Sequence, residues 1–285
     1  MELIGNRLLK ASLWMGGVVM LLVLNTHVVR SQEAKRRWDN LNEIRREKFD
    51  LILPEVMREN KINMWIITCR EGNFDPLHSF LGEGYVSHNG YYIFTDRGGN
   101  RIERAVLGID GYLLEEGKAY DYFGSESELK EFVEKRDPAR IGLNMSKDIG
   151  RADGLSYTAR LELGQILGKK FEQRFVSAEK LASDFRSRHT AGELAAFGEA
   201  ANFSYTIAEK AFSNDVITPG KTTLSDVAWW MMDQLFKNNL ESSFGMPSVY
   251  VTGPDGIAAT SNDRIIQRGD ILMIDWGVGF MGYYT

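Results

Sequence analysis

The chain has 285 residues, of which 44% are hydrophobic and 26% are charged, and its formal net charge is −5. These proportions are those of an ordinary globular protein with one large domain or two ordinary ones. The mild negative charge gives no electrostatic basis for binding nucleic acid, because proteins of that class carry basic patches, so we expect no nucleic-acid partner.

The N-terminal residues have the pattern of a secretory signal. Two basic residues precede an uncharged apolar run over residues 11–26, which is shorter than the roughly 20 residues of a membrane span. Val29 and Ser31 then place short side chains where a signal peptidase cuts. We therefore predict a signal peptide over residues 1–31 and an exported protein, periplasmic or secreted. The alternative is an uncleaved anchor helix, and only then do we expect a membrane location.

Residues 36–186 alternate between helical and strand patterns. Apolar residues at three- and four-residue spacing predict a helix over residues 36–60, which Pro54 should kink or split. Strands are predicted at residues 64–69, 91–96, 101–108, 140–145 and 175–176, and helices at residues 126–135, 155–167 and 178–185. This alternation is typical of a layered α/β domain. The only cysteine, Cys69, leaves an exported chain without an internal disulfide, so the hydrophobic core must supply the stability.

Two histidines in this region could be considered as metal ligands. His78 and His88 flank a glycine-rich loop over residues 81–90. Ten residues of separation on a loop is not a spacing that identifies a metal site, and such a site would need a further ligand. We interpret both as ordinary surface or core histidines.

Two helices are expected after residue 188. Thr190 and Glu193 have capping-box spacing, which predicts the start of the first helix. A turn at Pro219-Gly220 leads to the second helix, over residues 224–238. The inner face of the first helix is predicted to hold Leu194, Phe197, Ala201, Tyr205, Ala208, Ala211 and Phe212. In the second, Trp229, Trp230, Met231 and Met232 are interpreted as core rather than as a ligand platform, because they lie at helical spacing.

The stretch from Arg268 to Thr285 is the most specific in the chain. Residues 271–274 form an apolar run, predicted to be a buried strand, that ends at one carboxylate, Asp275. A charge beside four apolar residues is costly to bury unless it is paired or binds a metal. Asp275 is therefore a candidate metal ligand. The alternative is a strand-end carboxylate that caps a turn.

Four segments carry a family pattern, in order, over residues 188–285. They are Arg188-His189-Thr190 with Glu193; Ile217-Thr218-Pro219-Gly220; Gly253-Pro254-Asp255; and Arg268–Gly277 followed by Gly282-Tyr283. The first resembles R-x-K-T-x-x-E, with His189 in place of Lys, and the last is similar to G-D-x-x-x-x-D-x-G…G-Y-x-x-D. Together they resemble the pita-bread metallopeptidases, the family of aminopeptidase P, prolidase and methionine aminopeptidase. The resemblance implies a creatinase-like N-terminal α/β domain with a mixed sheet and helices (36–186). An incomplete α+β pita-bread metallopeptidase domain follows (188–285).

The resemblance also implies a cofactor. Two divalent metal ions, most often manganese and otherwise cobalt or zinc, are held in the family by two Asp, one His and two Glu. Asp275 falls on the first Asp, the second belongs just after Thr285, and the others lie further on. Because one carboxylate cannot hold two ions, we expect the 285-residue chain to be a C-terminally truncated, inactive fragment.

One family residue is missing. The relatives carry a loop His seventeen residues before the first Asp, where this chain has Ala258, and no His follows His189. Thr260 or Ser261 can donate a hydrogen bond there but cannot replace imidazole as an acid or base. No catalytic residue is therefore identified.

For the full-length protein, the resemblance implies a homodimeric, exported metallo-aminopeptidase. Its substrates would be peptides with proline in second position, from which it removes the N-terminal residue, or Xaa-Pro dipeptides. Two alternatives stay open. One is a metal-free, creatinase-type C–N hydrolase, against which Asp275 argues. The other is a non-catalytic pita-bread binding or scaffold protein, which the missing loop His favours.

Overall fold

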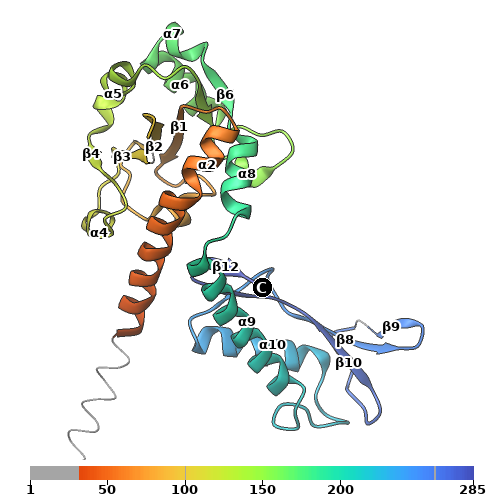
Figure 1. Ribbon diagram of the computed structural model, residues 1–285. Coiled ribbons are helices and arrows are strands. Elements are labelled where there is room, and N and C mark those ends of the chain that lie inside the picture. Colours follow the sequence, from red (N-terminus) through yellow and green to blue (C-terminus); the bar gives the residue numbers. More distant parts are fainter. Residues whose placement is uncertain (1–31, 100, 260) are drawn as a thin grey trace, which may run out of the picture. The chain divides into compact units, whose positions relative to one another are not determined.

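The computed structural model describes residues 32–99, 101–259 and 261–285, so the predicted signal peptide over residues 1–31 lies outside the described residues (Figure 1). Contacts group residues 44–285 into one compact unit, separate from residues 1–43. The domain boundary expected near residue 187 therefore stays a prediction. Within the described ranges, no helix combines the length and the apolar character that a membrane span requires.

The first described helical segment is split at Pro54, as predicted. Residues 32–51 are helical, and helix α2 spans Leu53–Glu59. Pro54 lies in the first turn of α2, where its missing N–H leaves no helical hydrogen bond unmade.

A six-stranded mixed sheet organises the region that follows, in the order β4-β3-β2-β1-β5-β6. Its strands are β1 (Met64–Arg70), β2 (Asn89–Asp96), β3 (Ile102–Leu107), β4 (Tyr122–Gly124), β5 (Ile141–Leu143) and β6 (Phe175–Ser177). Strands β1, β2 and β3 pair antiparallel, whereas β4, β5 and β6 each pair parallel with their neighbour. The five strands predicted from the sequence are all present, and the short β4 was not foreseen.

Helices accompany the sheet on both faces. They are α3 (His78–Leu81), α4 (Tyr112–Glu116), η1 (Glu126–Glu128), α5 (Leu129–Arg136), η2 (Gly150–Ala152), α6 (Tyr157–Leu167), α7 (Lys169–Glu172) and α8 (Glu179–Ser187). Alternate residues of a strand point to opposite faces. Trp65 of β1 accordingly packs in one buried cluster with residues of α2 and α8, and Ile66 in a second cluster with residues of α5 and α6. Covered on both faces, β1 and β2 are buried along their whole length except for the last residue of each, as expected of interior strands.

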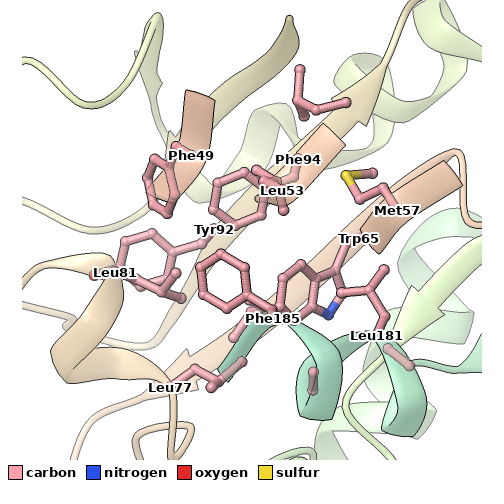
Figure 2. Packing of buried hydrophobic residues seen from close by; sticks show 14 of the residues in the cluster. Phe49, Leu53, Met57, Trp65, Leu77, Leu81, Tyr92, Phe94, Leu181 and Phe185 are labelled. Carbon is pink, nitrogen blue, oxygen red and sulfur yellow. The ribbon is translucent and has the colours of Figure 1, made fainter. Parts of the chain in front are cut away.

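Aromatic rings fill the first of these clusters. Phe49 meets Phe94 edge to face at 5.0 Å between ring centroids, and Trp65 meets Phe185 in the same way at 5.6 Å. Figure 2 shows these four rings together with Leu53, Met57 and Leu181. Such edge-to-face pairs add about 0.5–1.5 kcal/mol each beyond their buried area.

The C-terminal part of the chain begins with two capped helices, α9 (Ala191–Ala211) and α10 (Leu224–Lys237). Thr190 accepts a hydrogen bond from the Glu193 N–H at 3.3 Å, and the Glu193 carboxylate accepts one from the Thr190 N–H at 3.0 Å. The predicted capping box is confirmed. Thr223 and Asp226 form a second one at the start of α10.

The inner face predicted for α9 is right at Ala211, which is buried, but is otherwise rotated from the face that the structure buries. Leu194, Tyr205 and Phe212 are exposed, at 60%, 68% and 45%. The buried residues are Glu193, Ala196, Ala200, Ile207 and Ala211. The helix carries two apolar stripes, and spacing alone cannot choose between them. The inward direction of Glu193 makes the choice.

Two small sheets complete this part, in the orders β10-β8-β9 and β12-β11-β7. Their strands are β7 (Glu241–Ser242), β8 (Ser248–Gly253), β9 (Gly256–Ala259), β10 (Ile271–Asp275), β11 (Val278–Phe280) and β12 (Tyr283–Tyr284). Ala258, expected in a loop, instead belongs to β9, which forms a tight hairpin with β8. One buried cluster joins α9 and α10 to these strands.

A buried ion pair fixes the start of α9. Lys48 Nζ lies 2.6 Å from Glu193 Oε1, with side chains 3% and 1% exposed, and it also donates to the Arg188 carbonyl at 3.0 Å. Burial lowers the pKa of Lys48, and the hydrogen bond with Glu193 opposes that shift. The Tyr283 hydroxyl of β12 lies 3.4 Å from the same Glu193 oxygen. One carboxylate thus meets residues from three separate segments.

The first prediction concerns this ion pair. We expect Lys48→Met to lower the free energy of unfolding by about 3–5 kcal/mol, because it leaves the Glu193 carboxylate buried and unpaired. Adding Glu193→Leu should restore part of that loss, since no buried charge remains. Urea unfolding followed by circular dichroism measures both. Lys135→Met, at the exposed Lys135–Glu131 pair, is the control and should cost less than about 1 kcal/mol. Equal costs for Lys48→Met and the control would contradict the prediction.

The second prediction concerns Cys69, which is fully buried in β1. Burial raises the pKa of its thiol to about 12. Because only the thiolate is alkylated, we expect the native chain to react with iodoacetamide at pH 8 at least about a thousandfold more slowly than the urea-unfolded chain. Mass spectrometry of timed samples measures both rates. Comparable rates would show that the thiol is accessible in the folded protein.

Candidate functional site

Asp275 ends strand β10, and its surroundings differ from those expected. The strand is not buried, because its residues alternate between exposed and half-buried along β10, with Ile271 62% exposed and Met273 39%. Asp275 is also exposed. The argument that a metal must offset the cost of burying this charge is therefore wrong. The assignment of Asp275 as a metal ligand now depends on the family pattern alone and stays a prediction.

The alternation gives β10 two different faces. Leu272 and Ile274 pack against the buried cluster of α9 and α10. The other face is open, and there the ladder sets Asp275 opposite Ser248, Met273 opposite Tyr250 and Ile271 opposite Thr252. Side chains of such cross-strand pairs lie about 4.5–5.5 Å apart at Cβ. Asp275 therefore lies at the end of an open sheet face that mixes hydroxyl and apolar groups.

A pocket adjoins this end of the sheet. It has a volume of about 350 Å³ and lies between α10 and the start of β8, lined by Trp229, Met246, Ser248, Tyr250 and Asn262 among others. Ser248 lines the pocket and is also the cross-strand partner of Asp275. Asp275 therefore lies next to the pocket, because its cross-strand partner Ser248 forms part of the pocket wall.

The tryptophan–methionine cluster of α10 is only partly core. Met231 is fully buried, and Trp230 and Met232 pack against the same cluster, but Trp229 is 62% exposed and lines the pocket. The helical spacing correctly placed Met231 inward. It could not show that Trp229 borders a hollow, because β8, which forms the other wall, comes later in the sequence.

The hairpin after Asp275 requires glycine at one position. A Cβ on Gly277 would lie 2.2 Å from Ser243 Oγ and 2.4 Å from the Thr285 carbonyl oxygen. Thr285 comes this close because its N–H donates to the Val278 carbonyl at 3.0 Å and its hydroxyl accepts from the Val278 N–H at 2.9 Å. The D-x-G spacing of the motif thus has a steric reason, and Thr285 lies beside the residues that follow Asp275.

The described residues do not form a complete metal site around Asp275. Its side chain has no hydrogen bond or ion pair with any described residue, and no group of three or more His, Cys, Asp or Glu in those ranges is arranged to hold a metal ion. Hard divalent ions need several oxygen or nitrogen ligands. These residues alone therefore do not fit a pair of metal ions.

The loop position expected to carry a histidine has none. Ala258 lies in β9, on the hairpin with β8, and Ser261 is exposed, while Thr260 lies outside the described residues. The position at which the resemblance places a histidine therefore lies in an edge strand, β9, which holds no acidic or basic side chain.

The two earlier histidines have different environments. His78 is half-buried and stacks on Phe74, with ring centroids 4.3 Å apart, and its Nε2 has no hydrogen-bond partner among the described residues. Burial lowers its pKa. His88 is exposed, and its Nδ1 lies 2.9 Å from Glu126 Oε1.

Comparisons with known proteins find relatives by structure. No family model matches the sequence, and no curated protein matches it. Solved structures do match. The X-Pro aminopeptidase of Thermotoga maritima superposes with a TM-score of 0.59 at 17% identity, over 81% of this chain and 62% of that one. The Xaa-Pro dipeptidase of Bacillus anthracis superposes with a TM-score of 0.55 at 16% identity, over 86% of this chain and 63% of that one. Aminopeptidase P of E. coli superposes with a TM-score of 0.54 at 12% identity, over 84% of this chain and 60% of that one.

These matches confirm the predicted fold class, a mixed α/β domain followed by the start of a pita-bread domain. The chain spans only about 60–63% of the length of the structures that it matches. At these identities, the likeness concerns the fold. The chain therefore has the fold of the aminopeptidase P and prolidase structures, the pita-bread peptidases with an α/β domain at the N-terminus.

Proposed function

We propose that the whole protein is an exported metallo-aminopeptidase that removes the N-terminal residue from Xaa-Pro peptides or splits Xaa-Pro dipeptides. The observation that carries the proposal is the position of Asp275, the first Asp of the family motif, at the end of an open sheet face beside a pocket. The named activities of the matching structures support the substrate class.

The proposal includes two divalent metal ions, of which manganese is favoured over cobalt or zinc. Asp275 supplies one carboxylate, and the family resemblance implies a further Asp, one His and two Glu as the other ligands. Once bound, the ions would activate a water molecule for amide hydrolysis. Tyr250 and Ser248 lie on the same open face as Asp275 and would contact the peptide there. Residues 1–31 support export, and the family resemblance supports a homodimer.

A second candidate function is a pita-bread protein that binds peptides without cleaving them. Ala258 occupies the position of the family's loop His, and no histidine follows His189 in the sequence. The residues present in β9 and after it supply no imidazole for proton transfer. A protein with this fold and metal site but without the imidazole would bind peptides more readily than it would cleave them.

The third prediction tests the peptidase directly. The full-length protein, purified with Mn²⁺, should release the N-terminal residue from an Xaa-Pro peptide, measured by chromatography of the products. We expect Asp275→Asn to lower kcat/KM by about a hundredfold or more, because even the hydrogen-bond partners of metal ligands cost 10–100-fold when lost. Asp255→Asn, in the turn between β8 and β9, is the matched control and should keep the activity. A folded, metal-loaded protein that binds but never cleaves would favour the second candidate.

The fourth prediction concerns the 285 residues alone. Because Asp275 is a single ligand, we expect this chain to take up no pair of Mn²⁺ ions. Asp275→Asn should leave its metal content unchanged, as measured by elemental analysis after equilibrium dialysis. Uptake of two ions that disappears in the Asp275→Asn variant would show that these residues form the site without further ligands.

A further inference from the structure

Three polar side chains far from Asp275 in the sequence form a close triangle. His88 precedes β2, Asn89 begins it, and Glu126 begins η1. The Glu126 Oε1 atom lies 2.9 Å from His88 Nδ1 and 2.9 Å from Asn89 Nδ2, and the two nitrogens lie 2.8 Å apart. Each atom is therefore within hydrogen-bond distance of both others.

No arrangement of protons satisfies all three contacts. If His88 Nδ1 carries a proton, it donates to Glu126, but it then faces the amide donor of Asn89. If Nδ1 is unprotonated, it accepts from Asn89, but its lone pair then faces the Glu126 carboxylate. If the amide is turned round, its oxygen faces that carboxylate instead. The orientation of an Asn amide and the tautomer of a His are assigned rather than observed, and each assignment leaves one repulsive contact.

A cation would remove the conflict, because all three groups can offer a lone pair to one centre. We propose that His88 Nδ1, Glu126 Oε1 and the Asn89 amide oxygen, turned toward them, bind a divalent transition-metal ion. Two ligands at right angles, each about 2.1 Å from an ion, are about 3.0 Å apart. The observed 2.8–2.9 Å separations thus match three neighbouring corners of an octahedron. One imidazole with two oxygens suits zinc, cobalt or manganese.

The site is held rigidly on one side and is open on the other. Asn89 is 3% exposed, and its Oδ1 has no hydrogen-bond partner among the described residues in the orientation found. Its backbone N–H donates to the second Glu126 oxygen at 3.4 Å. A Cβ on Gly108 would lie 2.4 Å from the Asn89 carbonyl oxygen and 3.0 Å from Glu126 Cβ, so this glycine lets β2 and η1 approach. The His88 side chain is 65% exposed, which leaves access for the ion and for water ligands.

The site is independent of the proposed peptidase function, because none of its residues contributes to the face around Asp275.

The fifth prediction tests this site by calorimetric titration with Zn²⁺. The chain is prepared without a histidine tag and stripped with a chelator, both as the wild type and in an Asp275→Asn background, so that a site at Asp275 is counted separately. We expect one ion to bind in both. His88→Ala and Glu126→Gln should each weaken that binding at least about tenfold, since each removes one of three protein ligands. Glu131→Gln, which removes an exposed charge from α5, should leave it unchanged.

Thermal unfolding gives a second readout that does not depend on the heat of binding. An ion that binds only the folded state raises the melting temperature in proportion to ln(1 + [Zn²⁺]/Kd). That rise should disappear in His88→Ala, whose exposed side chain leaves the fold intact without metal. Three results would each overturn the proposal. The first is failure of the wild type to bind Zn²⁺. The second is binding by His88→Ala and Glu126→Gln that is as tight as that of the wild type. The third is a loss of affinity in Glu131→Gln as large as that in those two variants.

Discussion

The buried contact between Lys48 and Glu193 is the constraint on which the C-terminal part of the structure depends. Two opposite charges are almost completely removed from water here, and such a pair is tolerated only when each charge has its partner and its hydrogen bonds. Glu193 meets this condition by pairing with Lys48 while it caps α9 through the Thr190 N–H. If α9 rotated about its axis, Glu193 would move away from Lys48, and the Lys48 ammonium would stay buried without a partner. The buried faces of α9 and of the strands beneath it follow from that position.

The same carboxylate reaches the segment that follows Asp275. Tyr283 of β12 lies near Glu193 Oε1 and packs edge to face on Phe197 of α9, with ring centroids 5.2 Å apart. Strand β12 pairs with β11, and Gly277 leaves room for Thr285, which hydrogen-bonds to Val278 of β11. The hairpin after the candidate ligand is thus held by residues from the helix entry and from the N-terminal α/β region. A side chain at residue 48 therefore takes part in placing a strand more than two hundred residues later.

Sequence patterns succeeded where local chemistry decides the structure. The split at Pro54, the Thr190–Glu193 capping box and the five predicted strands of the mixed sheet were all foreseen, because proline geometry, side-chain caps and apolar runs act within a few residues. The errors came where a distant segment decides. Leu194 is exposed because Glu193 is drawn toward Lys48, and β10 is half-open because α9 and α10 cover only one of its faces. The pocket beside Trp229 was missed for the same reason.

The sequence by itself determined which residues can carry chemistry. It identified Asp275 in a motif with the spacing of a known family, the absence of a histidine at Ala258, and His88 as a histidine whose spacing from His78 indicates no ligand set. Only the tertiary structure decided their surroundings. The ladder with β8 put Asp275 on an open face, and the approach of η1 to β2 brought Glu126 to His88 across 38 residues. Side-chain identity is local, whereas burial and proximity depend on contacts between segments whose separation along the chain no local pattern records.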